Sequence, residues 1–117
     1  MTLASLEPAD ALDDAKLANA AACGDRLAFT AIYDRYADRL YDFCAGMLRD
    51  RHAAADCVQD VFVIAARKLA ALEDPDRLRA WLYAIARREA LACLKKRRRE
   101  RPSDELPDIV SADPDLA

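Results

Sequence analysis

Aromatic and basic side chains are concentrated in one stretch, residues 77–101, and their types are those that bind a polyanion. Trp81 and Tyr83 lie near its start, and six of the chain's eighteen basic residues fall within residues 95–101. Lys and Arg neutralise phosphates while aromatic rings stack on unpaired bases, so the combination indicates a nucleic acid with exposed bases. The net charge of -3 argues against such a ligand, but the charges are segregated. Residues 15–102 hold twelve acids against all eighteen bases.

Catalytic and metal sites find little support in the composition. The one histidine is His52 and the serines are confined to the two ends of the chain, which excludes a Ser/His/Asp arrangement in a core. Two isolated glycines cannot form a phosphate-binding loop. A zinc site with His52 and Cys57 as ligands is disfavoured, because residues five apart on a helix point in different directions. We therefore expect a protein that is not an enzyme and that uses no cofactor.

The four cysteines are not closely spaced, and each lies among apolar residues of an expected helix. They are Cys23, Cys44, Cys57 and Cys93. Cysteine often behaves as a small hydrophobic residue, so we expect four buried free thiols.

Four helices are expected to position these residues. The first spans about residues 10–23, the second follows the capping residue Asp25 as far as about residue 48, and the third follows Asp50 as far as about residue 72. The fourth begins at Asp74-Pro75, runs for about twenty-five residues and ends before Pro102. In the second helix Gly46 suggests either the close approach of a neighbour or a weak last turn.

A chain of 117 residues suffices for one domain with one core. We expect an all-α bundle of about four helices over residues 10–101, a disordered tail over residues 1–9 and an acidic linker over residues 102–117. No apolar run reaches the length of a membrane span, and no basic segment leads into an apolar one at the amino end. A cytoplasmic location without membrane insertion follows as an expectation, and a disulfide is not expected there.

Three motifs in order, FTAIYDRYADRLYDFC, AADCVQDVF and RLRAWLYAIARREAL followed by KKRRR, carry a family resemblance. Together they resemble the second conserved region of bacterial RNA polymerase sigma factors, most of all the extracytoplasmic-function (ECF) group, over residues 10–101. The resemblance implies that the third helix docks on the clamp helices of the largest subunit of core RNA polymerase. The outward polar contacts would then be Asp56, Gln59 and Asp60, while Val58, Val61 and Phe62 hold the helix to its own core.

The resemblance also implies that the fourth helix recognises the promoter minus-ten element and helps to melt it at the start of transcription. Its arginines would hold phosphates, and Trp81 or Tyr83 would stack on an unpaired base. The implied DNA-binding residues are Arg77, Arg79, Trp81, Tyr83, Arg87, Arg88, Lys95, Lys96, Arg97 and Arg98.

The two aromatic residues of this helix are expected to differ in role, because residues two apart on a helix point in nearly opposite directions. Trp81 follows Leu78 by three residues and precedes Ile85 by four, so it belongs on or beside the buried stripe. Tyr83 lies beyond Arg79 on a basic face. We expect Trp81 to be mostly buried with one ring edge reaching the DNA face, and Tyr83 to contact DNA.

The sequence departs from the family pattern in three ways. The link between the third and fourth helices, around Asp74-Pro75, is short and has no glycine, which predicts a smaller or different base pocket. Arg88 stands where the family has an asparagine, and an arginine can only donate hydrogen bonds to a base edge. The second DNA-binding domain for the minus-thirty-five element is absent, so we expect the chain to be an excised domain. The alternative function is a helical interaction module, for example one that binds an anti-sigma factor, without a DNA role of its own.

Overall fold

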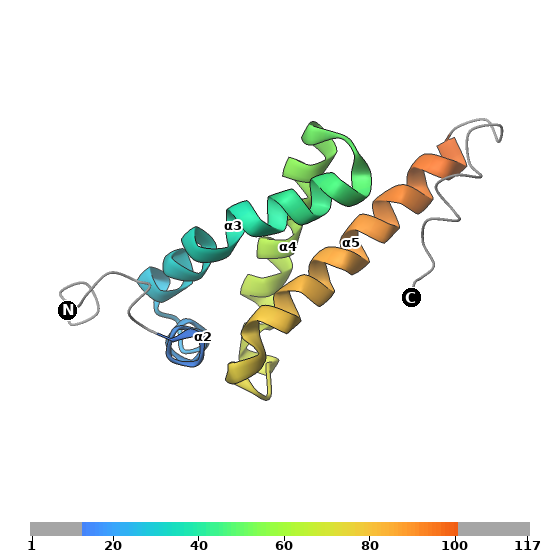
Figure 1. Cartoon of the computed structure of the whole chain (residues 1–117). Coiled ribbons are helices and arrows are strands. Elements are labelled where there is room, and N and C mark those ends of the chain that lie inside the picture. The colour runs from blue at the N-terminus through green and yellow to red at the C-terminus, as the bar shows by residue number, and fades with distance from the viewer. Residues whose placement is uncertain (1–12, 101–117) are drawn as a thin grey trace.

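The computed structural model describes residues 13–100, and this part of the chain is helical without a β-strand (Figure 1). The α-helices are α2 (Asp14–Ala22), α3 (Arg26–Leu48), α4 (Arg51–Lys68) and α5 (Leu78–Glu100). Two 3-10 turns, η2 (Leu69–Ala71) and η3 (Pro75–Arg77), join α4 to α5. The predicted all-α bundle of about four helices is thus confirmed. Both expected tails and residues 10–12 lie outside the described residues.

An aspartate precedes each of the first three helices and η3, where it can accept hydrogen bonds from unpaired backbone N–H groups. The carboxylate of Asp25 accepts from the N–H groups of Leu27 and Ala28, and that of Asp50 accepts from the N–H of Ala53. Such caps typically contribute about 1 kcal/mol each. The starts of α3 and α4 were therefore predicted correctly.

The link between α4 and α5 differs from the prediction. Helix α4 ends at Lys68, and the backbone tightens into η2 in place of the α-helix expected to run to about residue 72. Asp74 caps η3 by accepting from the N–H of Asp76, and α5 itself begins at Leu78. Because both turns are 3-10, the chain bends sharply while Leu69 and Leu78 stay buried.

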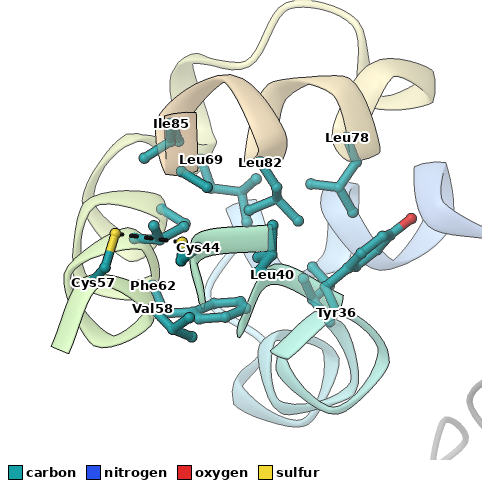
Figure 2. Packing of buried hydrophobic residues seen from close by; sticks show 14 of the residues in the cluster. Tyr36, Leu40, Cys44, Cys57, Val58, Phe62, Leu69, Leu78, Leu82 and Ile85 are labelled. Atoms are coloured by element: carbon teal, nitrogen blue, oxygen red, sulfur yellow. Dashed lines mark hydrogen bonds between the residues drawn. The ribbon is translucent and has the colours of Figure 1, made fainter. Parts of the chain in front are cut away.

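Helix α3 is the centre of the core and packs against the other three α-helices. Its buried residues recur every four positions, as they do where one helix crosses its neighbours. They are Ala28, Ile32, Tyr36, Leu40, Cys44 and Leu48. Figure 2 shows Leu40 and Cys44 between side chains of α4, such as Phe62, and Leu82 of α5. A Cβ added to Gly46 would meet nothing within 4 Å beyond its own stretch of helix, so of the two explanations offered for this glycine the close approach of a neighbour is excluded.

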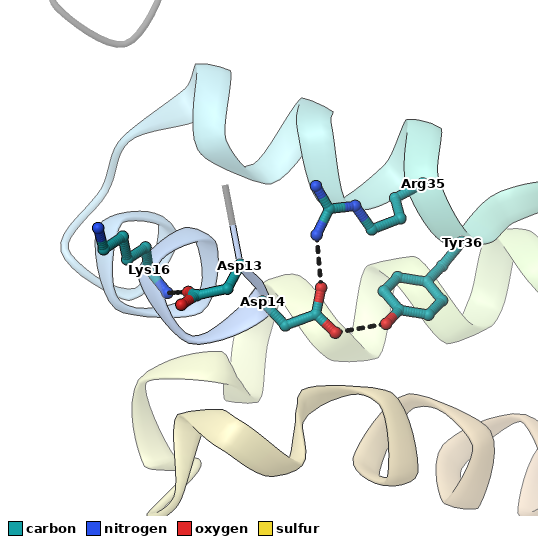
Figure 3. A network of polar contacts seen from close by, with 5 residues as sticks. All are labelled: Asp13, Asp14, Lys16, Arg35 and Tyr36. Atoms are coloured by element: carbon teal, nitrogen blue, oxygen red, sulfur yellow. Dashed lines mark hydrogen bonds and ion pairs between the residues drawn. The ribbon is translucent and has the colours of Figure 1, made fainter. Parts of the chain in front are cut away.

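Helix α2 is held to α3 by Asp14, which lies in the first turn of α2 (Figure 3). The Arg35 guanidinium donates to one carboxylate oxygen of Asp14 at 2.7 Å, and the Tyr36 hydroxyl donates to the other at 2.5 Å. Burial, and then the hydrogen bond to Asp14, raise the pKa of Tyr36 to about 12. The network therefore favours the protonated phenol.

The cysteines do not share one environment. Cys44 and Cys57 are buried, as predicted, and Cys93 is half-buried. Cys23 is exposed, contrary to the prediction, because α2 ends at Ala22 and the chain turns there towards Gly24. None of the helices within residues 13–100 combines the length and the apolar character needed to cross a membrane.

Candidate nucleic-acid interface and docking face

The outer face of α4 carries the polar residues expected to dock on a partner. Asp56, Gln59 and Asp60 are exposed, whereas Val58 and Phe62 are buried, together with Val61. The buried positions of α4 recur at spacings of three and four and therefore share one side of the helix. The opposite side faces solvent. The sequence placed these side chains on the correct faces.

Val63 lies in the middle of this polar face and was not anticipated. It follows Asp56, Gln59 and Asp60 by seven, four and three residues, so all four share one side of α4. The residue is 51% exposed, so it adds an apolar group to this polar side of the helix. Its spacing from Asp56 is the sequence signal that places it on the polar side. We name Asp56, Gln59, Asp60 and Val63 the docking face.

A second apolar residue, Tyr33 of α3, borders α4. Its ring lies 4.7 Å from the ring of Phe62, measured between centroids, yet 43% of the residue is exposed. One side of the phenol is therefore packed and the other is open to solvent. Exposed aromatic and apolar groups beside charged ones are typical of protein interfaces.

The basic residues of α5 and η3 form an exposed surface, which we name the basic face. Its exposed members are Arg77, Arg79, Arg87, Arg88, Lys95, Lys96 and Arg99. Arg98 is half-buried. These side chains are distributed along α5 and the turn that precedes it, but they point in different directions, because Arg79 and Arg88 are nine residues and thus about 180° apart around the helix.

Arg97 differs from its basic neighbours because the fold uses its side chain. Its guanidinium donates to the carbonyl oxygen of Leu48 at 3.2 Å and pairs with Asp50 at 3.4 Å. Leu48 ends α3 and Asp50 caps α4, so Arg97 ties the connection between α3 and α4 to α5. The N–H of Ala53 and the charge of Arg97 lower the pKa of Asp50. Arg97, which the family resemblance places among the DNA-binding residues, is thus engaged in contacts within the fold.

Trp81 and Tyr83 lie on the two flanks of the buried stripe of α5, and both are half-buried. The ring of Tyr83 meets Phe43 edge-on, with centroids 5.3 Å apart, and the Arg79 guanidinium lies over the Tyr83 ring, 5.9 Å from its centroid. The expectation that only Trp81 packs on the core is therefore wrong. The buried side of α5 is wide enough to include both flanks, which lie about 200° apart when measured across that side of the helix.

An open hollow of about 410 Å³ lies beside Trp81, between η2, η3 and the first turn of α5. Trp81, Leu72 and Ala80 supply apolar walls, while Glu73, Asp74 and Arg77 supply polar groups. The short, glycine-free link therefore still shapes a concave surface. One indole, carboxylates that can accept and a guanidinium that can donate are groups that suit a planar, polar ring such as a nucleobase.

Within residues 13–100, no three His, Cys, Asp or Glu side chains gather so that they could hold a metal ion. His52 is exposed in the first turn of α4, whereas Cys57 is buried.

Comparison with known proteins identifies a family that the chain matches. The family model for sigma-70 region 2 matches residues 32–100, which contain α4, α5 and most of α3. The chain is 32% identical over 75 residues to the ECF RNA polymerase sigma factor SigW of Bacillus subtilis, covering 64% of this chain and 40% of that protein. It is 29% identical over 69 residues to the ECF RNA polymerase sigma factor SigM of the same organism, covering 59% and 42%.

The chain spans about two fifths of the length of these curated relatives, and no solved structure matches it. The resemblance read from the three sequence motifs agrees with the family model and with both relatives. The matched residues include the docking face, the hollow and the basic face. The chain belongs to the sigma-70 region 2 family, as a region-two domain of the ECF group.

Proposed function

We propose that this chain docks on core RNA polymerase through the docking face of α4 and contacts the promoter minus-ten element through α5 in transcription initiation. The observation that carries the proposal is the presence of two chemically opposite surfaces on adjacent helices of one rigid core. The docking face combines carboxylates, an amide and an exposed valine. The basic face carries exposed cations beside a hollow walled by an indole.

The docking face suits a basic protein surface. Asp56 and Asp60 offer carboxylates to partner cations, Gln59 can both donate and accept, and Val63 offers an apolar contact. The clamp helices of the largest polymerase subunit are the partner that the sequence resemblance implies. An anti-sigma factor that covered the same face would exclude polymerase by competition, and we include such a regulator among the proposed partners.

The basic face suits DNA that has begun to open. Exposed arginines such as Arg87 and Arg88 can neutralise phosphates because their side chains lie outside the buried core. The hollow beside Trp81 would receive an unpaired base, with Arg77 placed to donate to it. This role as an initiation factor involves no reaction catalysed by the chain itself and takes place where the polymerase works, in the cytoplasm.

A titration tests the DNA half of the proposal. The chain is titrated with a labelled single-stranded oligonucleotide and with the duplex of the same sequence, each at a low and a high salt concentration. We expect weak binding that prefers the single strand and falls steeply with salt. An Arg87→Ala/Arg88→Ala variant should bind less tightly, whereas the matched Arg26→Ala/Arg51→Ala variant, with exposed arginines in the first turns of α3 and α4, should bind like the parent. Absence of binding to either DNA would favour the interaction-module alternative.

A further inference from the structure

Two buried thiols face each other across the contact between α3 and α4. The sulfur atoms of Cys44 and Cys57 are hydrogen-bonded and lie 3.4 Å apart (Figure 2). Cys44 is 0% exposed and Cys57 is 4% exposed. The bundle therefore holds two sulfur atoms in contact at its centre, although they come from different helices.

The two sulfur atoms are in contact but are not covalently bonded. A disulfide has an S–S length of about 2.05 Å, so the two sulfur atoms would have to approach by roughly 1.4 Å. The residues are 13 apart in sequence, and the chain between them makes the hairpin from α3 to α4. A bond there would close a loop that the native fold already closes by packing.

The two thiols of the pair are not equivalent, because the hydrogen bond between them lowers the pKa of Cys44. The hydrogen bond with Cys44, together with burial, raises the pKa of Cys57, and Cys93 and Glu89 of α5 lie close enough to raise it further. A protonated, buried thiol reacts slowly. Oxidation would therefore require a small oxidant and a brief local opening of the hairpin.

We propose that Cys44 and Cys57 are a modification site, at which a peroxide produces a reversible intramolecular disulfide that joins α3 to α4. The peroxide transfers one oxygen atom to one thiol, which becomes a sulfenic acid, and its other oxygen atom leaves as water. The second sulfur then attacks the sulfenic sulfur, and the hydroxyl group leaves as a second water. The two thiols lose two electrons and two protons in total, and the peroxide is reduced. A dithiol restores both thiols by exchange.

The bond would act on the helix that carries the docking face. Cys57 lies between Asp56 and Val58, on the side of α4 that is turned towards the core. Cross-linking would fix α4 to α3 from within while Asp56, Gln59 and Asp60 stay exposed. The inference does not depend on the proposed function, because it concerns only the contact between two helices.

Peptide mapping tests the proposal directly. The reduced, folded chain is treated with hydrogen peroxide, remaining thiols are alkylated, and the protein is digested with trypsin without reduction. Each cysteine falls in a different tryptic peptide, spanning residues 17–26, 40–49, 52–67 and 89–95. We expect a linked species of peptides 40–49 and 52–67 that disappears on treatment with dithiothreitol. A dominant link to residues 89–95, or oxidation of the thiols without any link, would overturn the proposal.

Matched variants separate the pair from the other thiols. Cys93→Ser should keep the link and Cys57→Ala should lose it, while Cys44→Ala provides a second test if Cys57→Ala does not fold. The oxidised parent should also melt at a higher temperature than the reduced parent, because the bond constrains the unfolded chain. Cys57→Ala should show no such rise. A lower melting temperature for the oxidised parent would show that the bond does not fit the native bundle.

Discussion

The ring of Tyr83 meets the ring of Phe43 edge-on, with centroids 5.3 Å apart and planes inclined at 88°. This contact joins the basic flank of α5 to α3. Edge-to-face aromatic pairs contribute about 0.5–1.5 kcal/mol beyond the area that they bury. Tyr83 therefore belongs to the fold as well as to the candidate DNA surface.

Replacing Tyr83 should show how much its ring contributes to the stability of the fold. We expect Tyr83→Ala to lower the free energy of unfolding by about 1–3 kcal/mol, less than a fully buried aromatic because the residue is only half-buried. Tyr83→Phe keeps the ring contact and should unfold at nearly the parental urea concentration. If Tyr83→Ala were as stable as the parent, the contact with Phe43 would contribute nothing to the free energy of unfolding.

Trp81 should contribute both to stability and to DNA binding. Trp81→Ala removes one wall of the hollow and a half-buried ring, so we expect a loss of stability of about 1–3 kcal/mol together with weaker binding of single-stranded DNA. Trp81→Phe retains a stacking surface and should recover much of the binding. Urea titration and fluorescence anisotropy measure the two effects. Unchanged binding in a folded Trp81→Ala variant would remove the hollow from the DNA interface.

Lys96 and Arg97 are adjacent cations that should behave differently. Arg97→Ala breaks the contacts with Leu48 and Asp50 and should cost roughly 0.5–1 kcal/mol of stability, a modest figure because both partners are partly exposed. Lys96→Ala should leave stability unchanged and lower the salt dependence of DNA binding by about one phosphate contact. Thermal melts and salt titrations of both variants check this. Equal losses of stability would contradict the distinction.

Tyr36 should give the fold an alkaline limit. Its pKa is raised from 10.0 to about 12, so the folded state holds the phenolic proton at a pH where the unfolded chain releases it. The contribution is fully present below pH 10 and is lost as the pH rises to about 12. Tyr36→Phe should lower stability at neutral pH and flatten this part of the profile, whereas Tyr33→Phe should retain it. Urea midpoints measured across the window decide between the two outcomes.

Much of the fold could be predicted because its signals are local. Asp25 and Asp50 begin helices through their own carboxylates, and the spacing of apolar residues after them predicts the buried sides. The end of α4 could not be predicted in this way, because Leu69 would suit an α-helix as well as the 3-10 turn that it forms. That choice depends on how the link must bend to bring Leu78 into the core.

The candidate site residues could be predicted only in part, because some of their contacts join segments that are far apart in the sequence. The polar side of α4 follows from periodicity, but Val63 looks like a core residue unless its angle around the helix is considered. The role of Arg97 depends on Leu48, which lies 49 residues earlier in the chain. Likewise, the contact between Cys44 and Cys57 requires the α3–α4 crossing, which no spacing of cysteines reveals.

The measurement that bears most directly on the proposed function is equilibrium capture of core RNA polymerase by the Gln59→Ala/Asp60→Ala variant. Both residues are exposed, so its melting temperature should match that of the parent. The matched control is Thr30→Ala/Asp42→Ala, which removes one neutral and one acidic exposed side chain from α3. We predict that the α4 variant binds core polymerase at least about tenfold more weakly, while the control binds like the parent. Parental affinity in the α4 variant, or an equal loss in the control, would contradict docking through α4.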